Sequence, residues 1–411
     1  VELEVNKWRS VIFSIGITLL APQVFRFTGH YSLSYIVAIP LSWLFLVKTI
    51  KLFHYKHILL LLANGMFWVA MHAYLGVMIA GFSLLVVIAE IIFDRKSLLR
   101  MLFVSTAIVI PVLLYLGFTN EIDTHLNRTN NPVGFNLYNA EIDDILVPPE
   151  KPLYPIIDYL TKGKVKLKWE ARGYLGLFNV LFLIGLFIIA ILALRRTQSR
   201  NLLTSFFAVK RLNSALLASL ILLVFALGFP FKAFPELLDV FGVMKQFRTT
   251  GRFVWPFYFV FSIFTAFVID YLIHRKNQNW LSALIMSSYM IMAFTEGFYY
   301  QKSVSSEITN HGNLFNQQHQ YLKQLDPKDY QAIITFPFYH TGSENFSLES
   351  DQHTLMHSML TSYSTGLPLM CSSLSRTSIT ESRSLVQLVG PAYYHKPIKS
   401  NLDLEKPILA L

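Results

Sequence analysis

Long apolar runs separated by short polar segments dominate the first three quarters of the chain. A membrane-spanning helix needs about 20 predominantly apolar residues, and nine runs reach or approach that length. They cover residues 10–27, 33–50, 57–71, 74–93, 99–118, 174–194, 212–229, 253–273 and 280–298. The pattern predicts a mainly α-helical, polytopic transmembrane bundle over residues 1–298, with an outer loop at 119–173 and an outer amphipathic segment at 230–252.

The pattern changes from about residue 299. Serine, threonine, asparagine, glutamine and histidine become frequent, and long apolar runs disappear. Residues 330–337 read as a short buried strand that follows a turn at 326–329. We therefore expect a second, extracytoplasmic domain of mixed α/β class at 299–411. The chain starts without methionine and stops inside an apolar stretch, so we expect a fragment in which this domain is incomplete.

Composition and charge agree with a membrane protein. Hydrophobic residues make up 53% of the chain and charged residues 15%, with a formal net charge of +10. Most basic residues occupy short loops that fall on one side if the N-terminus is cytoplasmic, as the positive-inside rule requires. We therefore expect no nucleic-acid partner. Glu90 and Asp270 lie beside these basic loops, where ion pairing is the simplest interpretation. Cys371 stands alone, which excludes an intrachain disulfide, and is expected to pack as a small apolar residue.

Two arginines, Arg248 and Arg252, directly precede the span at 253–273. An arginine near a bilayer is costly unless it snorkels or meets an anion, and its planar fork suits phosphate. Helical i,i+4 spacing would let both side chains reach one phosphate. An ion pair with Glu170 or Glu236 explains the same residues, so both interpretations stay open.

Three more polar residues fall on the same predicted surface. Arg26 and His30 close the first span, and His72 lies at the next outer turn. Snorkelling side chains and packing in an aromatic belt are the alternative to a shared site.

The predicted outer loop at 119–173 is longer than a plain connector, which favours a functional loop. Glu141 and Asp144 would share a helix face, and a solvated acidic face is favoured there over a metal site. Lysines and apolar residues then alternate over 162–169, so a strand would place Lys162, Lys164, Lys166 and Lys168 on one face. That face would bind anionic headgroups or a lipid pyrophosphate, or else protect a strand edge.

Glu170 follows the lysines as a candidate acid/base or acceptor-positioning residue, with a salt bridge as the alternative. In the tail, His340, Ser343 and Glu344 form a polar turn more readily than a site, because a Ser-His-acid triad cannot be recognised from proximity in sequence.

Four stretches resemble, in order, a bacterial group of polytopic membrane proteins related to YfhO. They are PQVFRFTGHYSLSYIVAIP at 22–40, NPVGFNLYNAEIDDILVPP at 131–149, WEARGYLGL at 169–177 and FRTTGRFVWPFYF at 247–259. That group looks like the GT-C superfold of membrane glycosyltransferases.

The resemblance implies that a sugar is transferred from a polyprenyl-phosphate donor to an extracytoplasmic glycan, lipid or cell-envelope acceptor at the bacterial inner (cytoplasmic) membrane. In GT-C enzymes an acidic residue of the first outer loop acts as base or metal ligand. That loop would precede Val1, so the sequence does not identify the residue that corresponds to the usual GT-C base. A divalent cation remains an open alternative as a cofactor.

The leading hypothesis is therefore a GT-C-like glycosyltransferase embedded among membrane lipids. Glu170 is its catalytic candidate, and the substrate-binding candidates are Arg248, Arg252, Arg26, His30, His72, Lys164, Lys166 and Lys168. A transporter or flippase for a lipid-linked glycan is the first competitor, and it predicts charges deep in spans and helices broken near the midplane. A non-catalytic cell-envelope scaffold is the second, and it predicts no cavity joining Arg252 to the lipid phase.

Overall fold

The computed structural model describes residues 5–94, 97–125, 127–129, 134–276, 279–322, 325–342, 346–374 and 377–411. The chain forms two compact units, one of Val1–Asn120 with Gly134–Ser305 and the other of Glu121–Val133 with Ser306–Leu411. The sequence placed a boundary at 299, whereas the units divide at 305 and the second unit also takes part of the long loop. The backbone N–H of Ile379 donates to the carbonyl of Asn127 over 2.9 Å, which ties that loop segment to the second unit.

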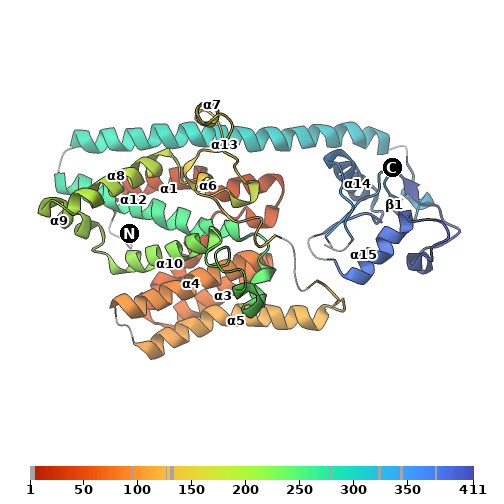
Figure 1. The fold of residues 1–411 in the computed structure, drawn as a ribbon, viewed down its shortest axis with the longest axis horizontal. Helices are drawn as coiled ribbons and strands as arrows, with labels where there is room; N and C mark the ends of the chain where they lie inside the picture. Colours follow the sequence, from red (N-terminus) through yellow and green to blue (C-terminus); the bar gives the residue numbers. More distant parts are fainter. Residues whose placement is uncertain are drawn as a thin grey trace. The chain divides into compact units, whose positions relative to one another are not determined.

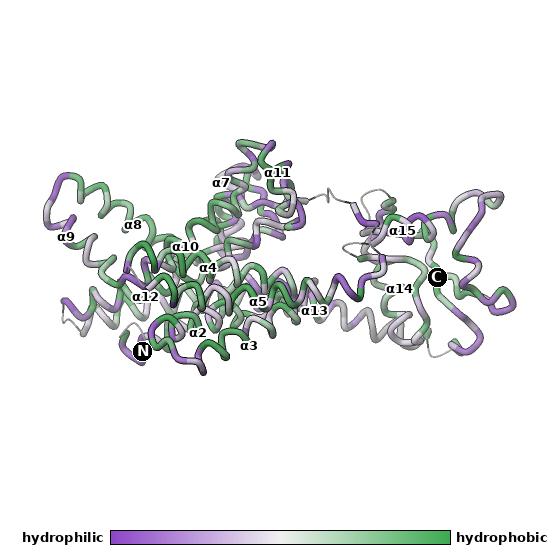
Figure 2. Tube along the Cα trace, turned by 90° about the horizontal axis from the view of Figure 1, so that it is seen from below, coloured by the Kyte–Doolittle hydropathy of each residue, from purple (hydrophilic) through white to green (hydrophobic). Residues whose placement is uncertain are grey.

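Long helices lying side by side make up the first unit (Figure 1). They are α1 (Lys7–Leu19), α2 (Ala38–Leu52), α3 (Tyr55–Met71), α4 (Ala73–Asp94), α5 (Leu98–Ile122), α8 (Leu177–Ala193), α9 (Thr197–Phe206), α10 (Lys210–Ala226), α12 (Trp255–Lys276) and the first part of α13 (Asn279–Leu322). Helix α10 packs on α4 and α12, and α3 packs on α2 and α4. Figure 2 shows that these helices are predominantly apolar.

In the described residues, six helices are long and apolar enough to cross a membrane, or seven if α9 and α10, bent by 86°, form one span. The shorter apolar helices α3 and α8, of 17 residues each, also fall where spans are predicted. The chain is therefore a mainly α-helical, multi-pass membrane protein, which confirms the coarse prediction from the apolar runs.

Helix α12 is the most enclosed of these spans, with 78% of its apolar window buried. It packs against α1, α8 and α10, and a helix that is apolar on all sides is suited to such a position. At one end Asp270 pairs with Arg9, which confirms the predicted pairing of that carboxylate. Glu90 is buried in α4, and its basic neighbours Arg95 and Lys96 lie outside the described residues.

Short helical segments connect the spans at the end of the bundle where α12 begins, called the site end below. They are η1 (Pro22–Thr28), η2 (Tyr31–Leu33), α6 (Asp143–Leu146), α7 (Tyr154–Thr161), η3 (Trp169–Ala171), α11 (Leu237–Val240), η4 (Gly242–Gln246) and η5 (Thr250–Val254).

Two local predictions are wrong here. Residues 164–168 form no strand and pair with no other segment that the structure describes. Residues 247–249 are irregular and 250–254 are 3-10, so Arg248 and Arg252 do not share an α-helix.

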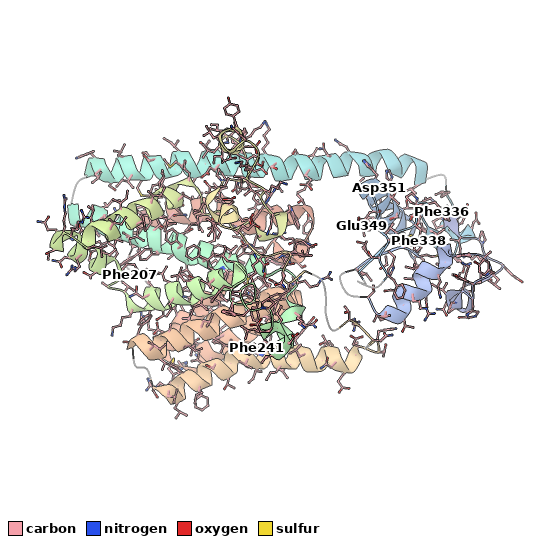
Figure 3. All side chains as sticks on the ribbon, viewed as in Figure 1. Phe207, Phe241, Phe336, Phe338, Glu349 and Asp351 are labelled. Atoms are coloured by element: carbon pink, nitrogen blue, oxygen red, sulfur yellow. The ribbon has the colours of Figure 1, made fainter. Side chains whose placement is uncertain are left out.

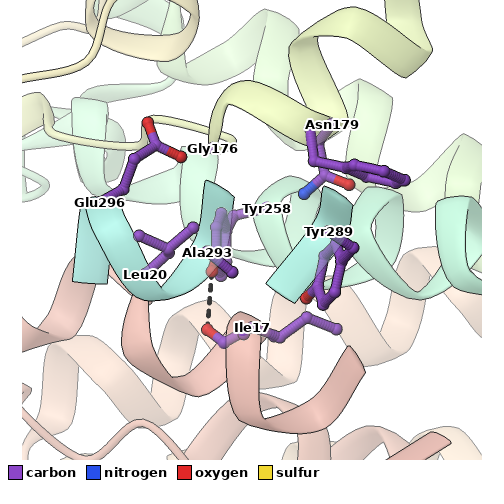
Figure 4. A pocket seen from close by; sticks show the side chains of 10 residues that line it. Ile17, Leu20, Gly176, Asn179, Tyr258, Tyr289, Ala293 and Glu296 are labelled. Atoms are coloured by element: carbon purple, nitrogen blue, oxygen red, sulfur yellow. Dashed lines mark hydrogen bonds between the residues drawn. The ribbon is translucent and has the colours of Figure 1, made fainter. Parts of the chain in front are cut away.

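A buried carboxylate fastens α13 to the start of α8. Glu296 accepts hydrogen bonds from the Tyr174 hydroxyl over 2.7 Å and from the Leu177 backbone N–H over 3.0 Å. Figure 4 shows Glu296 beside Gly176, in a narrow cavity where the Tyr258 hydroxyl donates to the Ile17 carbonyl over 2.7 Å. The cavity volume is about 10 Å³, which leaves room for about one water molecule and no substrate.

The second unit combines helices with very short strands. Its elements are α14 (Gln352–Thr365), α15 (Ile379–Val386), η6 (Pro327–Asp329), η7 (Gln387–Val389), η8 (Pro397–Asn401), β1 (Ile333–Ile334), β2 (His340–Thr341), β3 (Ser372–Ser373) and β4 (Leu409–Ala410). Strand β1 pairs in parallel with β4, and β2 pairs in parallel with β3. The predicted strand at 330–337 is present as the shorter β1, and the predicted turn forms η6.

The second unit has two small apolar clusters, one of Ile333, Leu367 and Leu409 at β1 and β4 and one beside β2. Figure 3 labels Phe336 and Phe338, of which the first is exposed and the second is buried with Tyr339 and Cys371. The buried position predicted for Cys371 is confirmed, and its Sγ lies 3.0 Å from the Thr335 hydroxyl. Ser343 and Glu344 of the predicted polar turn lie outside the described residues.

The buried His340 should make the stability of this unit depend on pH. Both ring nitrogens are buried without a hydrogen-bond partner among the described residues, and burial lowers the pKa of His340 below its ordinary value. In the unfolded chain the imidazole of His340 binds a proton near its ordinary pKa of about 6.5, so the stability of the folded unit falls as the pH drops below that value.

Hydrogen exchange of the 333–341 amides in the whole protein, corrected for intrinsic rates, should accelerate between pH 7.5 and 5.5. His340→Leu should flatten this dependence, and the exposed control His353→Gln should retain it.

Candidate functional site

Four predicted residues from three separate segments meet at the site end of the bundle. Oε2 of Glu170 lies 3.2 Å from a terminal guanidinium nitrogen of Arg26 and accepts from Nε of Arg252 over 3.0 Å, with a second, shorter bond to Arg252. Oε1 of Glu170 lies 3.5 Å from Nε2 of His30. We call these four residues the Glu170 cluster. The ion pair between Arg252 and Glu170, left open by the sequence, is present.

Arg26 is held inside the protein by more than the carboxylate. Its guanidinium donates to the carbonyls of Trp169 and Glu170 over 2.9 and 3.1 Å. It also lies over the Trp169 ring, 4.1 Å from the ring centroid. The Arg26 side chain is fully buried, with 0% exposure, so the end of η1 is fixed directly against η3.

Arg252 is placed from the other side by the start of α4. The Tyr74 ring centroid lies 5.5 Å from the Arg252 guanidinium carbon, and the Tyr74 hydroxyl donates to the Thr249 carbonyl. Tyr74 therefore holds both the arginine and the backbone turn that carries it.

Small residues let η3 and η5 approach each other. A Cβ atom at Gly251 would lie 2.6 Å from Cβ of Ala171 and 2.8 Å from the Tyr138 carbonyl. That carbonyl accepts the Gly251 N–H over 2.8 Å. A Cβ atom at Gly173 would clash with Val254 in the same way. These contacts explain the glycines of the WEARG and TTGRF stretches, since larger residues would push Glu170 away from Arg252.

A second polar network fixes the loop that carries Glu170. The buried Asp144 carboxylate accepts the backbone N–H groups of Glu141 and Lys168, each over 2.8 Å. Nζ of Lys168 binds Glu141 Oε1 over 2.6 Å and the Asn139 carbonyl over 3.2 Å. Burial raises the pKa of Asp144 although these bonds oppose the shift, and the Lys168 contact lowers the pKa of Glu141. Lys168 is thus engaged within the loop.

The electrostatic balance keeps Glu170 ionised. Burial alone would raise its pKa, but the His30 hydrogen bond and the charges of Arg252 and Arg26 outweigh burial and lower the pKa to about 2. A general base works best with a pKa near the working pH. The geometry therefore favours Glu170 as the group that orients both guanidiniums, over the proton-accepting role considered from the sequence.

His72 contributes a neutral imidazole near Arg252. Burial is the main cause that lowers the pKa of His72, and the charges of Arg252 and His30 lower it further. Its Nδ1 atom is buried and bonds to no described residue. At neutral pH this ring therefore adds a polar but uncharged group to the surroundings of Arg252.

The other predicted residues have different local surroundings. Arg248 lies in the irregular segment before η5, with its backbone carbonyl and Cβ against Gly134. Lys164 and Lys166 are exposed, and Glu236 is exposed as well. Among the described residues no group of three or more His, Cys, Asp or Glu side chains is arranged to hold a metal ion.

The sequence did not predict several residues that hold the Glu170 cluster and its backbone in place. Tyr74 and Trp169 contact the arginines as aromatic planes, and Asn139 binds the Thr250 hydroxyl over 2.8 Å. Trp169 lies beside Glu170 in the sequence, so adjacency could have indicated it. Tyr74 and Asn139 act across long sequence separations, which no local pattern reveals.

The chain matches the model of one known protein family. Residues 2–293 match the model of a family described as a domain of unknown function, DUF6311. The chain belongs to this family. The match covers every residue of the Glu170 cluster. No curated protein and no solved structure matches the chain.

The charge balance predicts that the Glu170 carboxylate stabilises the fold. Glu170→Gln keeps the side-chain shape but leaves Arg26 and Arg252 buried without their counter-ion, which should cost about 3 kcal/mol of unfolding free energy. Denaturant unfolding of the purified protein in detergent measures this loss. The exposed control Glu236→Gln should unfold like the wild type, and equal stability of both variants would contradict the structural role of the ion pair.

Proposed function

We propose that this protein is a membrane glycosyltransferase of GT-C-like architecture, in which the Glu170 cluster binds the phosphate of a polyprenyl-phosphate-linked sugar. The single observation that carries the proposal is the excess of cationic donors over carboxylate at this point. Two guanidiniums and an imidazole share one carboxylate. An oxyanion is the natural additional partner for such a set.

The accessible side of the cluster is where a lipid phosphate would arrive. The His30 side chain is 45% exposed, whereas Arg252 is 8% exposed and Arg26 is fully buried. The phosphate would therefore contact His30 first and Arg252 next, with Arg26 contributing its charge from behind. Glu170 would keep both arginines oriented before the donor binds.

This arrangement suits the step in which the donor phosphate leaves. The bond between the anomeric carbon and the phosphate oxygen breaks while the oxygen of an acceptor hydroxyl bonds to that carbon. The leaving phosphate gains negative charge, and the hydroxyl proton passes to that phosphate or to water. Fixed cations stabilise that developing charge. The neutral His72 ring would offer a hydrogen-bond acceptor to a sugar hydroxyl. The acceptor would be an extracytoplasmic glycan, lipid or cell-envelope component, with the site end facing outward from a bacterial inner membrane.

A binding measurement tests the phosphate role. The whole protein in lipid nanodiscs should bind polyprenyl phosphate at least about tenfold more tightly than polyprenol of equal length, since a hydrogen bond to a charged group contributes about 1.5–3 kcal/mol. His30→Ala should lower that preference by about tenfold, and Arg252→Lys should do the same because lysine loses the forked contact. The matched control is His274→Ala, an exposed histidine near the opposite end of α12.

Turnover separates the transferase from its competitors. In membranes containing the native acceptors, release of polyprenyl phosphate from a panel of polyprenyl-phosphate hexoses should require the wild-type cluster. Binding without release would overturn the transferase and favour the transporter or flippase. Equal affinity for polyprenyl phosphate and polyprenol would overturn the phosphate site itself and favour a scaffold.

A further inference from the structure

Helix α7 turns its apolar side chains outward although it is not a span. Within its eight residues, Ile156, Tyr159 and Leu160 fall on one helical face and are 55%, 83% and 71% exposed. Exposed apolar residues on the spans are explained by lipid tails, but this segment is too short to cross a bilayer. An outward apolar face marks an interaction surface.

The lysines around this helix give the surface a definite charge. Residues 151–167 contain Lys151, Lys162, Lys164, Lys166 and a single acidic residue, Asp158, which leaves a net charge of +3. All four lysines are exposed, whereas Val165 and Leu167 between them are half-buried. The alternation predicted from the sequence is therefore present in exposure, without a strand.

Polar contacts hold both ends of this segment, the first end against α13 and the second end within its own loop. Before it, Glu150 accepts a hydrogen bond from the Ser303 hydroxyl of α13 over 3.1 Å and lies 3.9 Å from Arg172. After it, Lys168 is bound to Glu141 and Asn139. Helix α7 projects beyond α13 in Figure 1, and in the perpendicular view of Figure 2 it lies near α11 on the side that projects from the long helices.

We propose that residues 151–167 form a membrane-surface anchor that binds anionic phospholipid of the leaflet at the site end. Ile156, Tyr159 and Leu160 enter the boundary between headgroups and acyl chains, while the lysines bind headgroup phosphates. A short apolar helical face next to a basic cluster is the combination that favours such interfacial binding. The anchor holds Trp169 and Glu170, which follow it directly, at the level of the headgroups. This assigns Lys164 and Lys166 to the bilayer rather than to the sugar donor.

A fluorescent probe at the exposed face tests the anchor in the whole protein. In a Cys371→Ser background, Tyr159→Cys is labelled with a polarity-sensitive dye, and the protein is reconstituted in phosphatidylcholine vesicles with or without 30 mol% phosphatidylglycerol (on the order of a natural anionic fraction). The dye should emit at shorter wavelength than in detergent. Its quenching by brominated lipid should rise about twofold or more when phosphatidylglycerol is present.

Charge variants complete the test. Lys164→Gln with Lys166→Gln should abolish the effect of phosphatidylglycerol, and the control pair Lys328→Gln with Lys399→Gln, both exposed in the second unit, should preserve it. Emission as in detergent under all lipid conditions would overturn the anchor. A response to a few mol% of polyprenyl phosphate in phosphatidylcholine, with none to phosphatidylglycerol, would also overturn it and assign the lysines to the donor. Neither result bears on the His30 and Arg252 binding test, so the two proposals fail separately.

Discussion

One buried charge, the guanidinium of Arg26, constrains the whole site end of the bundle. Burying an arginine is costly unless its charge is paired and most of its N–H groups find acceptors. Glu170 supplies the opposite charge, and the carbonyls of Trp169 and Glu170 accept from a terminal nitrogen, whereas the buried Nε bonds to no described residue. Since Arg252 shares the same carboxylate oxygen, η1, η3 and η5 cannot move independently. The ends of three spans are thus fixed through one carboxylate.

Polar contacts on both sides of Glu170 in the sequence help to fix its position. Asp144 and Lys168 hold the loop before Glu170, and Glu296 holds the backbone after it by binding Tyr174 and Leu177. A carboxylate that must hold two arginines needs a rigid backbone, because an error of about 1 Å would break forked hydrogen bonds. The surrounding polar residues therefore act on Glu170 by fixing its position, and the low pKa of Glu170 is a consequence of that fixed geometry.

The sequence predicts the spans and names all four residues of the Glu170 cluster, and there are physical reasons for this. Apolar runs predict membrane helices directly, and an arginine next to an apolar run needs an anion or water, which draws attention to Arg26 and Arg252. Its failures concern backbone form. Arg248 and Arg252 are spaced as on a helix, but residues 247–249 are irregular and 250–254 form a 3-10 turn, in which the Gly251 N–H bonds to the distant Tyr138 carbonyl. Likewise 162–168 alternates like a strand, yet a strand needs a partner and the loop instead binds through Asp144 and Lys168.

The same comparison separates two kinds of cation that the sequence groups together. Arg26 and Arg252 lie inside the protein, where a guanidinium acts through directed hydrogen bonds and is screened little by salt. Lys164 and Lys166 lie in solvent, where an ammonium acts through diffuse attraction that salt weakens. One phosphate group would not need both the buried arginines and the exposed lysines. The two sets are expected to bind different partners. Under the two proposals made above, this difference in burial would separate a specific phosphate contact at the Glu170 cluster from a general attraction of residues 151–167 to the membrane surface.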